Sequence, residues 1–138
     1  MRFVLDNSVV MRWLLEDGSA ERLAYADKVL VLLEQAEALV PGIWSLEAAN
    51  VILKSQAKGR VSDARVAEFL GLLHLMPITT DTSTASRALG DTLHLARRFN
   101  LSSYDASYLE LALREGLPLA TLDGDLRDAL AQTGGVLV

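Results

Sequence analysis

The stretch MRFVLDNSVV, Met1–Val10, decides how the rest of the chain is interpreted. Arg2–Leu5 is an apolar run with the length and composition of a buried β-strand, and Asp6 ends it. A carboxylate at this place has three interpretations. It could close a turn, cap the helix that is expected from Ser8, or bind a metal ion. The metal interpretation requires further carboxylates from distant parts of the chain.

The composition indicates one globular domain, residues 1–138. Hydrophobic residues make up 51% of the chain and charged residues 22%, so a core can form and disorder is not expected. The absence of cysteine excludes disulfides and thiolate metal sites, and it suits a reducing cytoplasm. We find neither a signal-peptide pattern nor an apolar run of membrane-spanning length. We therefore expect a cytoplasmic protein that does not insert into membranes.

Short apolar runs alternate with helical patterns along the whole chain. Strands are expected at Arg2–Leu5, Ala38–Val40, Pro77–Thr80, Leu117–Leu122 and Val136–Val138. Helices are expected at Ser8–Leu15, Ala20–Ala36, Trp44–Ala57, from a Ser62 cap to about Leu75, Thr82–Phe99, Ser102–Glu115 and Leu126–Gln132. This alternation predicts an α/β fold, with a mainly parallel sheet and helices on both of its faces.

Four carboxylates occupy places that a parallel sheet would bring together. Asp123 follows the fourth expected strand as Asp6 follows the first. Glu47 lies near the start of the helix after the second strand, and Asp105 lies in the first turn of the helix before the fourth. Ligands of such sheets bind beyond the carboxyl ends of the strands, where the strand order reverses. We therefore predict that the four acids share one rim of the sheet.

Each acid also has an ordinary structural explanation. Asp6 and Asp123 could be turn residues, Glu47 could favour the positive end of its helix, and Asp105 could belong to a helix cap. These explanations hold for the residues one at a time. They do not explain why the fold would bring all four to one place.

The chemistry of such a cluster points to divalent cations. Two carboxylates about 5 Å apart repel by roughly 3 kcal/mol at an effective dielectric constant near 20. Neither His74 nor His94 lies near the four acids in the sequence pattern, so the ligands would all be oxygens, which favour Mg²⁺ or Mn²⁺ over zinc. The net charge of −5 argues against nucleic-acid binding through the overall electrostatic field. If cations offset the four acids, the charge of the rest of the chain is −5 + 4 = −1. An ion held in this way can activate water for attack on a phosphate.

Four segments resemble the motifs of PIN domains, and more narrowly those of VapC-type toxin ribonucleases from toxin–antitoxin pairs. They are VLDNSVVMRWL (Val4–Leu14), WSLEAANVILK (Trp44–Lys54), LSSYDASYLELA (Leu101–Ala112) and LATLDGDL (Leu119–Leu126), in the family's order and spacing. The resemblance implies a three-layer sandwich whose five-stranded sheet has the order 3-2-1-4-5. That order would place Asp6 beside Asp123.

The resemblance also implies the roles of particular residues. The acidic metal-site residues would be Asp6, Glu47, Asp105 and Asp123. Ser8 and Thr121 match small hydroxyl positions, and Asn50 matches an amide that shares the helix face of Glu47. We expect these three to donate hydrogen bonds near the site rather than to bind the ion. Asp125 is a further acid, for which a solvated loop is the expected environment.

The implied activity is endonucleolytic cleavage of RNA with Mg²⁺ or Mn²⁺. The implied partners are an RNA substrate, a cognate VapB-type antitoxin and a second copy in a homodimer, and the family uses its first helices to form the antitoxin groove. Lys54, Lys58, Arg60 and Arg65 gather near one helix end. They could suit the helix dipole or contact RNA phosphates.

Two other classes of protein remain as alternatives. A Mg²⁺-dependent phosphotransfer domain, of the receiver or phosphatase type, also places an Asp at a strand end. Receivers need an acidic pair after the first strand and a lysine after the last, but Asn7 and Ser8 follow Asp6 and no lysine follows Lys58. Phosphatases of the haloacid-dehalogenase type need a second Asp where Ser8 stands. A non-catalytic PIN-like module would be expected to lack one or more of the four acids.

Overall fold

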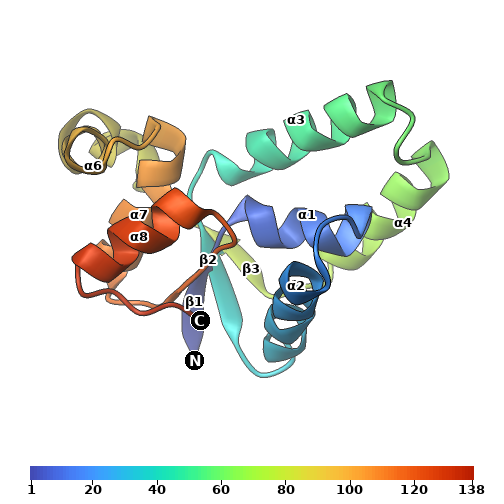
Figure 1. Ribbon diagram of the computed structural model, residues 1–138, viewed down its shortest axis with the longest axis horizontal. Helices are drawn as coiled ribbons and strands as arrows, with labels where there is room; N and C mark the ends of the chain where they lie inside the picture. Colours follow the sequence, from blue (N-terminus) through green and yellow to red (C-terminus); the bar gives the residue numbers. More distant parts are fainter.

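A short parallel sheet forms the centre of the protein in a computed structural model, which describes residues 1–138 (Figure 1). Its strands are β1 (Arg2–Leu5), β2 (Glu37–Val40), β3 (Ile78–Thr80) and β4 (Leu119–Ala120). The strand order is β3-β2-β1-β4, and every pair is parallel. From β1 the chain adds β2 and β3 on one side and then β4 on the other, so the strand order reverses at β1. The carboxyl ends of β1 and β4 therefore flank the topological switch point, where ligands of such sheets bind.

Helices cover the sheet from two sides. They are α1 (Asn7–Leu15), α2 (Ala20–Leu32), α3 (Trp44–Ala57), α4 (Asp63–Leu73), α5 (Thr84–Arg87), the π-helical segment η1 (Ala88–Thr92), α6 (Leu93–Phe99), α7 (Ser103–Glu115) and α8 (Gly124–Gln132). Figure 1 shows α1, α2 and α4 on one side of the sheet and α6, α7 and α8 on the other. The predicted α/β class is therefore confirmed. No helix is both long and apolar enough to cross a lipid bilayer.

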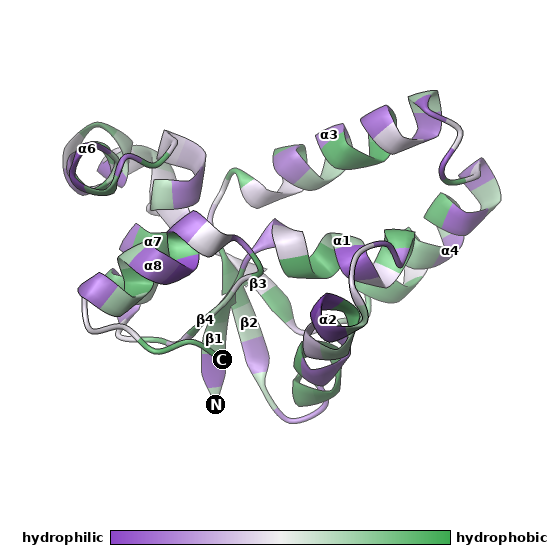
Figure 2. Cartoon of the chain, in the orientation of Figure 1, coloured by the Kyte–Doolittle hydropathy of each residue, from purple (hydrophilic) through white to green (hydrophobic).

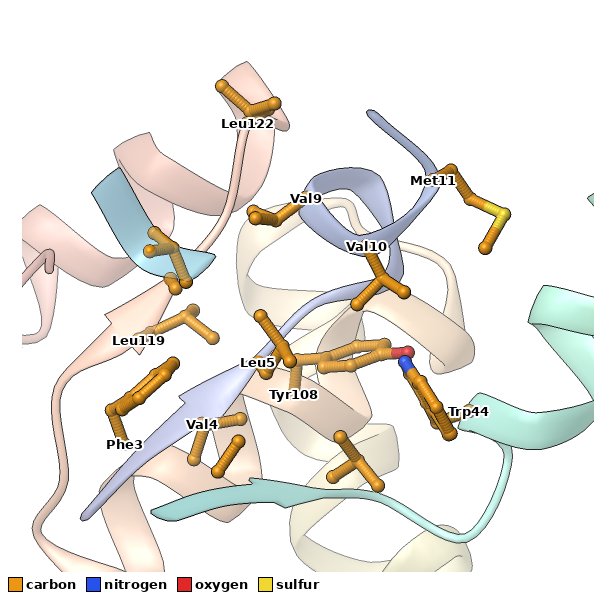
Figure 3. Close-up of a cluster of buried hydrophobic side chains, with 14 of the residues drawn as sticks. Phe3, Val4, Leu5, Val9, Val10, Met11, Trp44, Tyr108, Leu119 and Leu122 are labelled. Atoms are coloured by element: carbon orange, nitrogen blue, oxygen red, sulfur yellow. The ribbon is translucent and has the colours of Figure 1, made fainter. Parts of the chain in front are cut away.

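The core is built on β1 and the helices next to it. Phe3, Val4 and Leu5 have no exposed surface, and they pack with side chains from α1 and α7 (Figure 3). Hydrophobic residues run along the central strands in Figure 2. Since a parallel strand is covered on both faces, a continuous apolar run is what such a strand requires. The predictions for Arg2–Leu5 and Trp44–Ala57 agree with the structure residue for residue.

The prediction of a fifth strand is wrong. The sheet has four strands, and Val136–Val138 contributes only an isolated parallel bridge between Leu137 and Leu119. This segment lies along β4, because the Leu119 amide donates to the Val136 carbonyl and the Val138 amide donates to the Leu119 carbonyl. Because β4 has only two residues, it offers too short an edge for a further strand.

The fourth strand is also shorter than the predicted Leu117–Leu122. It ends at Ala120, because the next amides donate to side-chain oxygens instead of to a neighbouring strand. The Leu122 amide donates to Ser8 Oγ over 3.0 Å, and the Asp123 amide donates to Thr121 Oγ1 over 3.1 Å. The polar residues of the predicted site therefore end this strand.

Two predicted helices differ from the structure by more than two residues. The predicted helix Thr82–Phe99 is divided into α5, η1 and α6, because Gly90 has non-helical dihedral angles (φ −115°, ψ −105°) that a residue without a Cβ adopts easily. The predicted helix Ala20–Ala36 ends at Leu32, where the backbone continues in tighter turns such as the Leu33 amide to Leu30 carbonyl bond. Neither change affects the elements that carry the four acids.

Candidate metal site

Asp6 lies at the carboxyl end of β1 and is held by two hydroxyl groups. Its residue is 5% exposed, and its amide donates to the Ala120 carbonyl over 2.9 Å. Ser8 Oγ and Thr121 Oγ1 both donate to Asp6 Oδ2, each over 2.7 Å. Neither hydroxyl contacts Oδ1. The carboxylate is thus oriented by one oxygen, which leaves the other oxygen available to a further ligand.

Ser8, in the first turn of α1, and Thr121, just after β4, also connect the two segments that form the site. Each hydroxyl accepts a backbone amide from the segment after β4, as described above, while it donates to Asp6. The two hydroxyl oxygens lie 3.5 Å apart. The structure therefore places both residues where the sequence analysis expected small hydroxyl groups, beside Asp6.

Glu47, in the first turn of α3, is held by a tyrosine that the sequence analysis did not assign. Tyr108 of α7 donates its hydroxyl to Glu47 Oε1 over 2.6 Å, and Tyr108 is completely buried. Tyr108 stands three residues after Asp105, so the helical repeat places both on one face of α7. That spacing was the feature of the sequence from which the contact could have been suspected.

Asn50 is placed differently from the other two predicted helpers. It is exposed and makes no hydrogen bond to Glu47, although both residues line an open cavity of about 590 Å³ beside α3. Asn7 and Tyr104 line the same cavity. Asn50 is therefore adjacent to the site without supporting it.

Asp105 lies in the first turn of α7 and Asp123 precedes α8, and both helices lie on the side of the sheet away from α1 (Figure 1). The Asp105 amide donates to the Ser102 hydroxyl over 3.0 Å, so Ser102 is the residue that caps α7. Asp123 is the cap of α8, because its Oδ1 accepts the Leu126 amide over 2.9 Å. The cap interpretation given to Asp105 holds for its amide, whereas Asp123, for which a turn was expected, caps a helix. Asp6 precedes α1 but makes no side-chain cap bond.

The charges of the four acids act on one another. Burial raises the pKa of Asp6, and the charge of Asp123 raises it further. Burial also raises the pKa of Glu47, with smaller contributions from Asp6 and Asp105. Burial and then the charges of Asp123, Asp6 and the exposed Asp125 raise the pKa of Asp105 to about 6. These charge effects connect Asp6 with Asp123, Glu47 with Asp6 and Asp105, and Asp105 with Asp6 and Asp123.

No basic side chain neutralises this group. None of the four acids forms an ion pair with lysine, arginine or histidine. Asp81 is the informative contrast, because it follows β3 as Asp6 follows β1. Burial alone would raise the pKa of Asp81, but hydrogen bonds from Arg114 and Thr84 lower it below its usual range. The protein therefore neutralises Asp81 with an arginine and leaves Asp6, Glu47, Asp105 and Asp123 without a cationic side chain.

The donor set fits Mg²⁺ or Mn²⁺ better than a softer metal. The four side chains offer only carboxylate oxygens, and the chain has no cysteine. No three acidic or histidine side chains are preassembled at coordination distance. Mg²⁺ usually takes one or two protein carboxylates and keeps several water ligands, so it does not need such a cage. The residues present fit an ion of this kind.

The chain belongs to the PIN domain family, whose model matches residues 3–130. It is similar to a solved structure, "Crystal structure of PAE2754 from Pyrobaculum aerophilum", with 27% sequence identity and a TM-score of 0.66. The match covers 99% of this chain and 91% of that chain. No curated protein matches the sequence significantly. PIN domains are generally metal-dependent nucleases, so the class of protein and the chemistry of the site agree.

The first prediction concerns stability without metal. Because the pKa of Asp105 is raised to about 6 in the folded protein, its ionisation opposes folding as the pH rises through that range. We expect Asp105→Asn to raise the Tm of the protein in EDTA at pH 7 by a few degrees. The gain should shrink as the pH falls from about 6 to below 3.8, where the carboxyl becomes protonated in both the folded and the unfolded states.

The matched control for this test is Asp27→Asn, which changes an exposed acid of α2. Differential scanning calorimetry across the pH series measures both variants. A Tm difference at pH 7 that is the same for Asp27→Asn and Asp105→Asn would contradict the proposed repulsion.

The second prediction concerns the hydroxyl that holds Asp6. Thr121→Val keeps the shape of a side chain with no exposed surface and removes the bond to Asp6 Oδ2. Groups that orient metal ligands typically contribute about 10- to 100-fold to metal affinity, so we expect a loss of that size for Mn²⁺. Isothermal titration calorimetry measures it. Thr133→Val is the control, because the Thr133 hydroxyl donates to the Leu130 carbonyl at the end of α8. Equal affinities in the two variants would count against the role of Thr121.

Proposed function

We propose that this protein is a Mg²⁺- or Mn²⁺-dependent endoribonuclease and the toxin component of a VapBC-type toxin–antitoxin pair. The observation that carries the proposal is the group of four acids without a basic partner at the switch point of a PIN-domain sheet. The match to the PIN family supports the nuclease class. The toxin role and the RNA substrate rest on the motifs around the four acids.

Each residue of the proposed metal site would have a separate role. Asp6 and Asp105 would hold the main ion, and Glu47 and Asp123 would serve as further ligands or orient water. The bound ion would activate a water molecule and stabilise charge on the phosphate. Ser8 and Thr121 keep Asp6 in one orientation, and Tyr108 does the same for Glu47.

Three cations near the end of α3 support a phosphate-binding role. Lys54, Lys58 and Arg60 are exposed and form no ion pair, so their charges are free to meet RNA phosphates. Arg65 is unlike them, because its guanidinium donates to the Trp13 carbonyl over 3.1 Å. The proposed phosphate contacts therefore exclude Arg65.

The proposed protein partners are a cognate VapB-type antitoxin and a second copy of this chain. Met11, Trp13 and Leu14 of α1 are buried in the core, and we do not include them in the proposed antitoxin surface. An apolar cavity of about 580 Å³ between α3, α4 and β3 is the surface that we assign to an antitoxin segment. The homodimer is proposed from the resemblance to the VapC-type family alone.

The third prediction tests the nuclease. Asp6→Asn removes the charge of a buried ligand while keeping its shape, so we expect cleavage of single-stranded RNA to fall by more than about 100-fold, beyond the loss from a supporting group. EDTA should abolish wild-type cleavage, and Mg²⁺ or Mn²⁺ should restore it. Asp27→Asn is the control. Full activity of a folded Asp6→Asn variant, with a circular dichroism spectrum like the wild type, would refute the proposal.

The fourth prediction tests the phosphate contacts in the inactive Asp6→Asn background. Replacing Lys54 and Lys58 by glutamine should weaken binding to single-stranded RNA and reduce its salt dependence. Each lost phosphate contact should lower the slope of log K against log salt by about 0.7. Fluorescence anisotropy at several salt concentrations measures the slope. Lys28→Gln, on α2, is the control, and an unchanged slope in the double variant would contradict the assignment.

A further inference from the structure

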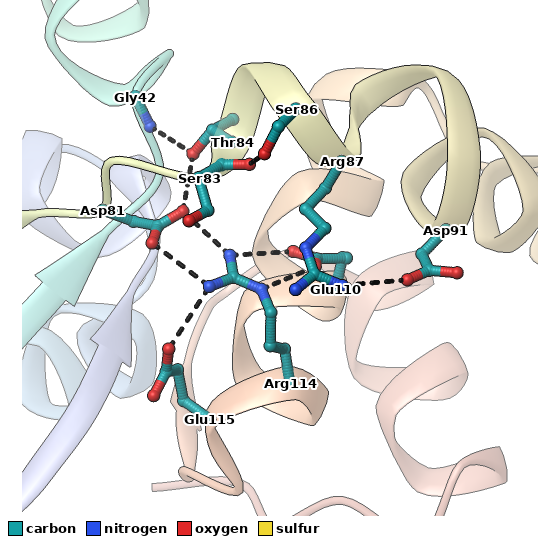
Figure 4. Close-up of polar contacts among 10 residues, drawn as sticks. All are labelled: Gly42, Asp81, Ser83, Thr84, Ser86, Arg87, Asp91, Glu110, Arg114 and Glu115. Atoms are coloured by element: carbon teal, nitrogen blue, oxygen red, sulfur yellow. Dashed lines mark hydrogen bonds and ion pairs between the residues drawn. The ribbon is translucent and has the colours of Figure 1, made fainter.

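A partly buried network of ion pairs and hydrogen bonds connects α7 to the segment before α3, outside the acidic site (Figure 4). Its centre is Arg114, in the last turn of α7. The guanidinium donates to both oxygens of Asp81, with Nη2 to Oδ2 at 2.8 Å and Nη1 to Oδ1 at 3.2 Å. Its Nε donates to Glu110 Oε1 over 2.8 Å. The side chains of Arg114, Asp81 and Glu110 are 16%, 8% and 5% exposed.

The network continues from Asp81 to the backbone before α3. The Thr84 hydroxyl donates to Asp81 Oδ2 over 3.0 Å and accepts the Gly42 amide over 2.8 Å. Gly42 stands two residues before Trp44, where α3 begins. The Asp81 amide donates to the Val40 carbonyl at the end of β2. An unbroken series of bonds therefore runs from α7 to the segment that enters α3.

The start of α3 needs such support from elsewhere. The residue at its N-terminal cap position is Ile43, which has no side chain that could accept a hydrogen bond from the first turn. The helices α2, α4 and α7 each have a serine in that position, and its hydroxyl accepts a backbone amide. Because α3 has no side-chain cap of its own, the bond from the Gly42 amide to Thr84 Oγ1 is the side-chain contact that fixes the backbone just before the helix.

The same helix, α7, reaches α3 at a second point. Tyr108 donates to Glu47 Oε1, five residues beyond Gly42. The two contacts come from different turns of α7, one near its middle and one at its end. One contact holds Glu47 within α3 and the other holds Gly42 just before α3, so together they restrict the rotation of the helix that decides where the Glu47 carboxylate points.

We propose that Arg114, Asp81 and Thr84 are positioning residues, which fix the entrance of α3 and thereby direct Glu47 towards Asp6 and Asp105. The inference rests on the proposed function, because it gives the network a purpose in holding the metal site. A buried ion pair is by itself weak support for stability, since the cost of removing both charges from water offsets their attraction. The network is therefore better explained by the geometry that it imposes.

The test uses Thr84, because its hydroxyl can be removed without leaving a buried charge unpaired. Thr84→Val breaks the bonds to Gly42 and Asp81, whereas Thr84→Ser keeps the hydroxyl. Ser86→Ala is the control on the same helix, since the Ser86 hydroxyl donates only to the Ser83 carbonyl. Two readouts apply to the full chain: hydrogen exchange of residues 42–47 without metal, and the Mn²⁺ dissociation constant from calorimetry.

We expect Thr84→Val to speed exchange across residues 42–47 and to weaken Mn²⁺ binding by about 10-fold, the lower end of the range for groups that orient ligands. Thr84→Ser and Ser86→Ala should resemble the wild type in both readouts. If Thr84→Val lowers only the Tm, with exchange and Mn²⁺ affinity unchanged, the network has only a structural role. The inference then fails, while the proposed metal site stands. If the wild type binds no Mn²⁺, the proposed metal site fails and takes this inference with it.

Discussion

The bond between the Asp6 carboxylate and two hydroxyl groups is the interaction on which the site depends. A carboxylate that is almost completely buried costs several kcal/mol unless hydrogen-bond donors replace the lost water. Ser8 comes from the segment after β1, and Thr121 comes from the segment after β4, so solvating Asp6 also joins these two strand ends. The same hydroxyls accept the amides that end β4. One buried charge thus organises both the edge of the sheet and the approach to α8.

Asp6 and Asp81 occupy equivalent places at strand ends but have opposite electrostatic environments. Asp81 and Asp6 each follow a strand of the sheet, yet Arg114 neutralises Asp81 while no cation reaches Asp6. The first arrangement lowers the pKa of the acid and gives a fixed connection between elements. The second raises the pKa values of neighbouring acids and stores repulsion that a divalent ion would relieve. Both acids follow a strand of the sheet, and their partners differ: Asp81 pairs with an arginine, whereas Asp6 accepts hydrogen bonds from two hydroxyl groups.

The errors of the sequence analysis lie where tertiary contacts replace local preference. The pattern of Thr82–Phe99 is helical throughout, but Gly90 permits a break that the periodicity does not show. Leu117–Leu122 is apolar enough for a long strand, yet side-chain oxygens near Asp6 take the amides that would have continued it. The expected fifth strand is reduced to a single bridge for the same reason, because a two-residue β4 leaves it little to pair with.

The sequence by itself determined the α/β class, and it predicted that Asp6, Glu47, Asp105 and Asp123 share one rim of the sheet. It could do so because strands and helices have different apolar periods, and because parallel strands end at one edge. The tertiary structure alone decided which side chains hold these acids. Tyr108 meets Glu47 across 61 positions of sequence, and Arg114 meets Asp81 across 33. No local pattern encodes such pairs, since they depend on how α7 packs against the rest of the fold.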